Sequence, residues 1–339
     1  MTTRRLFLVL MGIVTAWVPT CAWTQQPGRL QTVAILSPGK RVDMAGCATS
    51  NRGVGPGCFL EGLRALGYEE GRNVAFEYRF AEGLAERLPA LAAELARLRP
   101  DVIFTFTSAA AHAAAAATST IPIVVGPAGE RTFERLAGNF ARPAGNVTGV
   151  TLDSTAQEEK CLQLLKELAP HTSSVAILVN PENPNYRDHP GDLLPAAKRL
   201  GIALTRVDVR NTADLPKAFA TIRASGADAI LLLDDPALAG SATVRKEIIR
   251  SALERRLPLA SSSWRVAPDG GLVSLGADNA TLSRRAAFFA HRILSGATPA
   301  DLPVERPTTY KLSVNRTTAT ALGLTIPQSL LLRADEVIQ

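Results

Sequence analysis

Apolar and polar positions follow two alternating periods along the first half of the chain. Apolar runs at residues 32–36, 101–107 and 121–125 have the length and the β-branched composition of strands, and residues 74–80 alternate as a strand does. Between these runs, residues 59–66 and 88–98 carry leucines at helical spacing, and the alanine-rich stretch 109–117 favours a helix. Buried strands that alternate with amphipathic helices predict parallel βαβ units with helices on both faces of the sheet.

The second half repeats the same order of elements. Strands are predicted at 175–179, 203–209, 227–233, 257–260 and 271–275, and helices at 193–200, 214–224, 242–255 and 281–294. The turn-rich segment 142–146 is a hinge candidate between the halves. The length exceeds that of a typical single domain. We therefore predict an α/β fold of two Rossmann-like lobes, with ligands bound beyond the carboxyl ends of the strands.

The N-terminus has the composition of a signal peptide. Arg4 and Arg5 form a short basic head, an apolar run follows at 6–18, and small residues stand where a signal peptidase would cleave. This run is shorter than the roughly 20 apolar residues that span a bilayer. We expect residues 1–24 to be removed and the protein to be exported to the periplasm. The Sec and twin-arginine routes both fit the two arginines.

Two of the four cysteines, Cys47 and Cys58, lie in one glycine-rich segment. Export to an oxidising compartment favours a disulfide between them, and two free thiols in a loop are the alternative. Their spacing does not suit a zinc ribbon. Cys161 lies in a helical pattern and is predicted to be a small core residue.

Composition argues against several other functions. The formal net charge of +6, or +4 without Arg4 and Arg5, is spread along the chain without a basic run, which disfavours nucleic-acid binding. None of the four histidines has metal-ligand spacing, and the sequence contains neither a G-x-S-x-G nor an H-E-x-x-H motif. We therefore expect no catalytic set, no metal and no cofactor.

Polar residues follow three of the predicted strands. Ser108 stands where a strand runs into the alanine-rich helix, so the helix N-terminus could hold a carboxylate, and plain capping is the alternative. Asp234 and Asp235 could pair with a ligand ammonium group or cap the following turn. Asn180 could hydrogen-bond a ligand or form a turn in its proline-rich loop. Together these groups would suit a zwitterionic amino acid.

Collinear motifs along the whole mature chain resemble one family. They lie at residues 59–68, 70–74, 77–79, 88–95, 121–124, 141–149, 301–305 and 321–331. The chain is similar in these blocks to ABC transporter substrate-binding proteins of the tryptophan- and tyrosine-binding kind. The resemblance implies a type 1 periplasmic-binding-protein fold with three crossovers, a ligand between the lobes, and a separate permease and ATPase.

The resemblance also implies lobe boundaries and a binding site. Lobe 1 is expected to comprise 30–148 and 273–303, and lobe 2 to comprise 149–272 and 304–339. The expected ligand-binding residues are Ser37, Thr107, Ser108, Ala109, Thr151, Asp153, Asn180, Asn183, Asp234, Asp235, Ser274 and Gly276.

Departures from the family pattern fall at the expected cleft. They are Leu275 for the usual tyrosine, and altered loops at 106–108 and 127–131, so the ligand need not be aromatic. The expected function is capture of an amino acid or related carboxylate by a monomeric subunit of an importer. The alternative is a solute sensor that docks on a membrane receptor.

Overall fold

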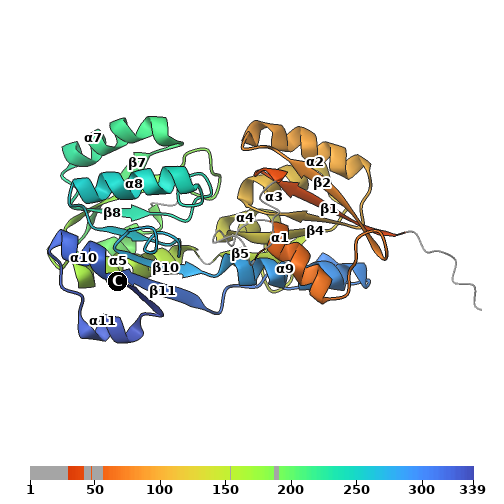
Figure 1. Ribbon diagram of the computed structural model, residues 1–339. Helices are drawn as coiled ribbons and strands as arrows, with labels where there is room; N and C mark the ends of the chain where they lie inside the picture. The colour runs from red at the N-terminus through yellow and green to blue at the C-terminus, as the bar shows by residue number, and fades with distance from the viewer. Residues whose placement is uncertain (1–29, 42–46, 48–55, 153, 187–190) are drawn as a thin grey trace, which may run out of the picture.

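The chain folds into two α/β lobes, each built on its own sheet (Figure 1). The structure is a computed structural model that describes residues 30–41, 47, 56–152, 154–186 and 191–339. The predicted signal peptide at 1–24 and the expected site residue Asp153 lie outside the described residues. Within the described ranges, no helix is both long and apolar enough to cross a membrane.

The first lobe contains a parallel sheet of order β2-β1-β3-β4-β5. Its strands are β1 (Gln31–Ser37), β2 (Val74–Phe80), β3 (Val102–Thr105), β4 (Ile123–Gly129) and β5 (Val147–Leu152). Its helices are α1 (Pro56–Ala65), α2 (Leu88–Arg97), α3 (Ser108–Ala117), α4 (Glu130–Leu136) and α9 (Asn279–Leu294), with 3-10 turns at Ala85–Arg87 and Pro299–Asp301. In α2, Leu88, Leu91 and Leu95 are buried at helical spacing, as the pattern predicts.

The second lobe contains a mixed sheet of order β12-β11-β10-β9-β8-β6-β7. Its strands are β6 (Ser174–Val179), β7 (Ala203–Asp208), β8 (Ala229–Leu232), β9 (Leu259–Ser261), β10 (Val273–Ala277), β11 (Tyr310–Asn315) and β12 (Glu336–Ile338). Its helices are α5 (Ser154–Leu168), α6 (Leu194–Leu200), α7 (Leu215–Ser225), α8 (Ala242–Glu254), α10 (Arg316–Leu322) and α11 (Gln328–Arg333), with a 3-10 turn at Thr212–Asp214. Strand β11 runs antiparallel to β10, and the other pairs are parallel.

Three crossovers join the lobes: β5 into α5, β10 into α9, and residues 302–309 into β11 (Figure 1). Their positions differ from the expected boundaries. Strand β5 pairs with β4, so the first sheet runs to Leu152 and not to residue 148. Strand β10 pairs with β9 and β11, so the chain returns to the first lobe after Ala277 and not at residue 273.

The predicted hinge at 142–146 is wrong, because this segment is a turn inside the first lobe. The Asn146 side-chain amide donates to the carbonyls of Thr118 and Ile121, at 3.0 and 2.7 Å. These bonds tie the start of β5 to the connection between α3 and β4. The turn therefore belongs to the first lobe and does not connect the two lobes.

Each lobe has apolar cores on the two faces of its sheet. In the first lobe, Val33 and Ile35 face the core under α1 and α9, while Ala34 and Leu36 face the core under α2 and α3. The rings of Phe59 and Phe104 stack in the first of these cores, with centroids 3.7 Å apart. Cys161 is buried in the second lobe as predicted, and burial raises the pKa of its thiol.

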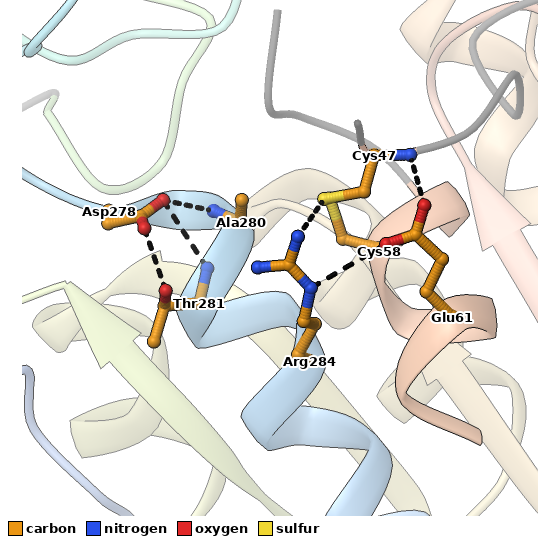
Figure 2. Close-up of a disulfide and its surroundings, with 7 residues drawn as sticks. All are labelled: Cys47, Cys58, Glu61, Asp278, Ala280, Thr281 and Arg284. Carbon is orange, nitrogen blue, oxygen red and sulfur yellow. Dashed lines mark hydrogen bonds and ion pairs between the residues drawn. A yellow bond between two sulfur atoms is a disulfide. The ribbon is translucent and has the colours of Figure 1, made fainter. Parts of the chain in front are cut away.

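A disulfide joins Cys47 to Cys58 at the start of α1, the pairing expected from the sequence (Figure 2). The Cys47 N–H donates to the Glu61 carboxylate at 2.7 Å, and an Arg284 N–H donates to the Cys47 sulfur at 3.2 Å. Arg284 also lies 3.6 Å from Glu61. Because Arg284 belongs to α9, the bridge is anchored to two helices that are far apart in the sequence.

Candidate ligand-binding site

A pocket lies between the two lobes, at the carboxyl ends of their parallel strands; we call it the cleft pocket. Its first-lobe residues are Phe106, Thr107, Ser108, Pro127, Ala128, Gly129 and Leu152, from the ends of β3, β4 and β5. Its second-lobe residues are Asn183, Asn185, Tyr186, Asp234, Pro236, Gly240 and Arg265. Asn279, the first residue of α9 after the second crossover, completes the lining.

On the first lobe, the chain passes from β3 into α3 through Thr107. Thr107 is the helix N-cap, at φ 90° and ψ 155°, a position that the sequence assigned to Ser108. Its side chain makes no capping bond, and its buried Oγ1 has no hydrogen-bond partner among the described residues. The first bond back to the cap runs from the Ala111 N–H to the Thr107 carbonyl, at 3.1 Å. The preceding N–H groups have no acceptor within the helix, and this helix end lies at the pocket that Thr107 and Ser108 line, where it can hold an anion.

On the second lobe, Asp235 organises the loops that line the pocket. Its Oδ1 accepts the N–H groups of Ala237 and Leu238, at 2.8 and 3.1 Å. The side-chain amides of Asn180 and Asn183 donate to its two oxygens, at 3.3 and 2.7 Å. Burial raises the pKa of the Asp235 carboxyl, and these four donors lower it in part. Asp235 and Asn180 thus hold the turn and the proline-rich loop, and Asn183 also reaches the pocket.

Asp234, the neighbouring residue, presents its carboxylate to the pocket. The Asn279 amide donates to its Oδ2 at 3.4 Å, and Arg265 Nη1 lies 4.0 Å from its Oδ1. Arg265 is 5% exposed, and burial lowers the pKa of its guanidinium to about 10, so the group stays charged at neutral pH. The cleft pocket therefore contains one carboxylate and one guanidinium, both on the second lobe.

Asn185 and Tyr186 were not predicted as site residues. The Asn185 N–H donates to Asn183 Oδ1 at 2.9 Å, and Asn185 is 2% exposed with an Oδ1 that has no partner within the described part of the chain. The Tyr186 hydroxyl donates to the Asp234 carbonyl at 3.2 Å, and burial raises the pKa of this phenol. Both residues continue the Asn-Pro-rich loop after β6. The sequence therefore indicated the right loop, but we predicted site residues in it only as far as Asn183.

Asn180, Asp235 and five further expected site residues lie outside the pocket lining. Ser37 Oγ accepts the Gly39 N–H at 3.2 Å, and Thr151 Oγ1 bonds to the Ala128 carbonyl at 3.0 Å. Ser274 Oγ donates to the Trp264 carbonyl at 3.2 Å, and Gly276 leaves room for the Trp264 backbone. Ala109 lies one residue beyond the pocket in α3. The side chains of Ser37, Thr151 and Ser274 thus bond to backbone groups beside the cleft.

The pocket has the chemistry of a binding site. Phe106, Leu152 and Pro127 form an apolar wall opposite the polar groups of the second lobe. In the described part of the chain, no group of three or more His, Cys, Asp or Glu side chains is placed to hold a metal ion. His112 of α3 does not line the pocket, and burial lowers the pKa of its imidazole. The arrangement can bind a small molecule that carries opposite charges.

Comparison with known proteins places this fold among binding proteins. A conserved domain protein of Vibrio cholerae superposes with a TM-score of 0.80 and 28% identity, covering 91% of this chain and 100% of that one. An ABC domain from Streptococcus pneumonia in complex with L-Trp also gives a TM-score of 0.80, at 23% identity over 91% of this chain and 100% of that one. These neighbours identify the fold as that of a type 1 periplasmic binding protein, as predicted.

Sequence comparison agrees with the structural one. A tyrosine-binding protein of Clostridioides difficile (strain R20291) is 22% identical over 266 residues, which are 78% of this chain and 75% of that protein. Residues 54–338 match the family described as ABC transporter substrate binding protein. This match spans most of the chain, and the protein therefore belongs to the family of ABC transporter substrate-binding proteins.

Proposed function

We propose that the protein captures an amino acid in the cleft pocket and delivers it to an ABC permease. One observation carries this proposal: the two lobes present complementary groups to the same pocket. The N-terminus of α3 and Thr107 face it from the first lobe, and the Asp234 carboxylate faces it from the second. A free amino acid has a carboxylate for the first group and an ammonium for the second.

The apolar wall and the relatives support the same ligand class. Phe106 and Leu152 are buried and line the pocket, so they offer a surface for an apolar or aromatic side chain. The similar proteins include one named for tyrosine binding and one solved with L-Trp. Arg265 lies beside Asp234 and offers a second contact for a ligand carboxylate or carbonyl.

The remaining parts of the proposal concern location and partners. Residues 1–24 are proposed to direct export to the periplasm. A monomer there would close around its ligand, and the closed form would dock on a permease that works with a separate ATPase. Neither a cofactor nor nucleic acid has a role in this scheme.

Isothermal titration calorimetry of the purified protein tests the ligand class. We expect binding within a panel of the amino acids that includes L-tryptophan and L-tyrosine. Removing either charge from the bound amino acid should abolish measurable binding; for tryptophan, tryptamine lacks the carboxylate and indole-3-propionate lacks the ammonium. If the analogue without the ammonium bound as well as the amino acid, the ligand would instead be a simple carboxylate.

A variant of the acidic group tests the placement of the ligand. Asp234→Asn should weaken binding of the amino acid by about 10- to 150-fold, because a hydrogen bond to a charged group contributes about 1.5–3 kcal/mol. Asp208→Asn is the matched control, since Asp208 lies on the same lobe, pairs with Arg206 and does not line the pocket. Equal affinities of the Asp234→Asn variant and the control would remove Asp234 from the site.

A further inference from the structure

Gly129 and Asn185 touch across the cleft from opposite lobes. Gly129 ends β4 of the first lobe, and Asn185 lies in the loop after β6 of the second. A Cβ added to Gly129 would lie 1.9–2.0 Å from Oδ1, Cγ and Nδ2 of Asn185. No side chain larger than that of glycine fits between these two residues while the lobes keep this arrangement.

The conformation of Gly129 separates this contact from the folding of its own lobe. Gly129 has φ −63° and ψ 148°, an extended backbone that any residue adopts. The three atoms nearest to an added Cβ all belong to the opposite lobe. The backbone of the first lobe therefore permits an alanine here, and the closest collision of its Cβ is with Asn185 of the opposite lobe.

Asn185 is held in place from its own lobe. Its N–H is bound by Asn183, which in turn donates to Asp235, and its side chain is almost completely buried. Among the residues that the structure describes, Asn185 Oδ1 has no hydrogen-bond partner. Asn185 also lines the cleft pocket. One side chain thus contacts the opposite lobe and reaches the ligand cavity.

A second contact crosses the cleft close by. Arg131, two residues after Gly129, pairs with Asp192, which lies between Asn185 and α6 in the sequence. The Arg131 Nε donates to Asp192 Oδ2 at 3.1 Å, and Nη2 contacts the same oxygen. The pair is partly exposed, so it stabilises closure less than a buried contact would.

We propose that Gly129 and Asn185 determine whether the lobes can close, and hence set the affinity of the cleft pocket. This inference rests on the proposed function for its ligand, but the contact itself is a property of the closed lobes. When only the closed form binds tightly, the apparent dissociation constant rises as the closed fraction falls. Gly129 would then control affinity by leaving the space that Asn185 occupies on closure.

Cross-linking tests the contact without any ligand. Gly129→Cys combined with Asn185→Cys should form an interlobe disulfide on mild oxidation, detected as a linked peptide by mass spectrometry. Thr120→Cys combined with Asn185→Cys is the control, because Thr120 is exposed at the opposite end of β4. Absence of the link in the first pair, or equal linkage in both pairs, would overturn the proposal. A failure of the proposed ligand class would leave this result unaffected.

Affinity tests the consequence for binding, with L-tryptophan and L-tyrosine as probes. Gly129→Ala should weaken binding at least tenfold, whereas the matched control Gly191→Ala should not, because an added Cβ at Gly191 meets no atom within 4 Å. In an Asn185→Ala background, Gly129→Ala should cost less than twofold. Unchanged melting temperatures of the ligand-free variants would show that each one folds. An equal loss in both backgrounds would contradict the interlobe origin.

Discussion

Thr107 has a backbone conformation that a β-branched residue rarely adopts. Its φ of 90° and ψ of 155° lie in a region that is almost reserved for glycine, and such strain costs about 1–3 kcal/mol. Strained residues of this kind cluster at functional sites, and Thr107 lines the cleft pocket with an Oγ1 that has no partner among the described residues. The proposed ligand contact would account for the strained cap.

A glycine at this position should trade binding for stability. Thr107→Gly relieves the strain but loosens the unfolded chain, so we expect a net gain of about 1 kcal/mol in the free energy of unfolding. Loss of Oγ1 should weaken binding of the amino acid about 2- to 10-fold. Urea denaturation and calorimetry measure the two effects. Thr120→Gly, at an exposed loop position without positive φ, should lose stability. A less stable Thr107→Gly variant would show that Thr107 is not strained.

At the residue scale, the sequence predicted the positions of the polar groups better than it predicted the role of each group. Asp234 and Asp235 are neighbours at one strand end, yet the first faces the pocket and the second is enclosed by four donors. These two roles differ only because the backbone after β8 directs the two side chains to different surroundings. Arg265 escaped prediction because it is charged and isolated in the sequence, while the fold buries it beside Asp234.

The elements that were predicted followed from periodicity, and several others were missed. Strands such as β6 and helices such as α2 lie within a residue or two of their predicted ranges, because each is a continuous apolar run or stripe. Strands β5, β11 and β12 and helices α4, α5, α10 and α11 were not predicted as elements. Of these strands, β11 is the antiparallel one. Its residues do not form the continuous apolar run of a buried parallel strand, and only the pairing with β10 identifies it.

The disulfide at the start of α1 should stabilise the fold through the unfolded chain. It closes a loop with a sequence separation of 11, for which chain entropy predicts about 3 kcal/mol. The double variant Cys47→Ser, Cys58→Ser should lose about this free energy of unfolding in urea titrations. Dithiothreitol should destabilise the native protein equally and leave the variant unchanged. A variant as stable as the native protein would indicate that Glu61 and Arg284 already order the segment (Figure 2).

At the scale of the whole molecule, the two-lobed plan was predictable and its boundaries were not. The alternation of strands and helices predicted two parallel α/β units, and the two sheets confirm it except for the antiparallel strand β11. The crossovers lie at the ends of β5 and β10, inside runs whose local sequence gives no sign of a change of lobe. The turn at 142–146 carried the strongest local hinge signal, but Asn146 fastens it within one lobe.

Separate cores in the two lobes predict separate local stabilities. Phe104 is buried in the first lobe, and Phe219 is buried in the second, where Arg255 lies 4.8 Å from its ring centroid. Replacing either ring by alanine leaves a cavity that costs about 3–5 kcal/mol. In the ligand-free protein, the lobes are joined by three crossovers and by contacts such as Arg131 with Asp192. These links are weaker than the cores, so local unfolding of one lobe should not require unfolding of the other.

Hydrogen exchange measured by mass spectrometry distinguishes the lobes directly. Phe104→Ala should speed exchange in β1, β3 and α1 and leave β6, β8 and α7 at the native rate, while Phe219→Ala should do the reverse. A ligand in the cleft contacts both lobes. A saturating amino acid that binds should therefore couple their unfolding and reduce the difference in exchange rate between the lobes. If either variant accelerated exchange equally in both lobes without ligand, the lobes would form one cooperative unit. Closure would then have to proceed in a protein whose lobes do not unfold independently.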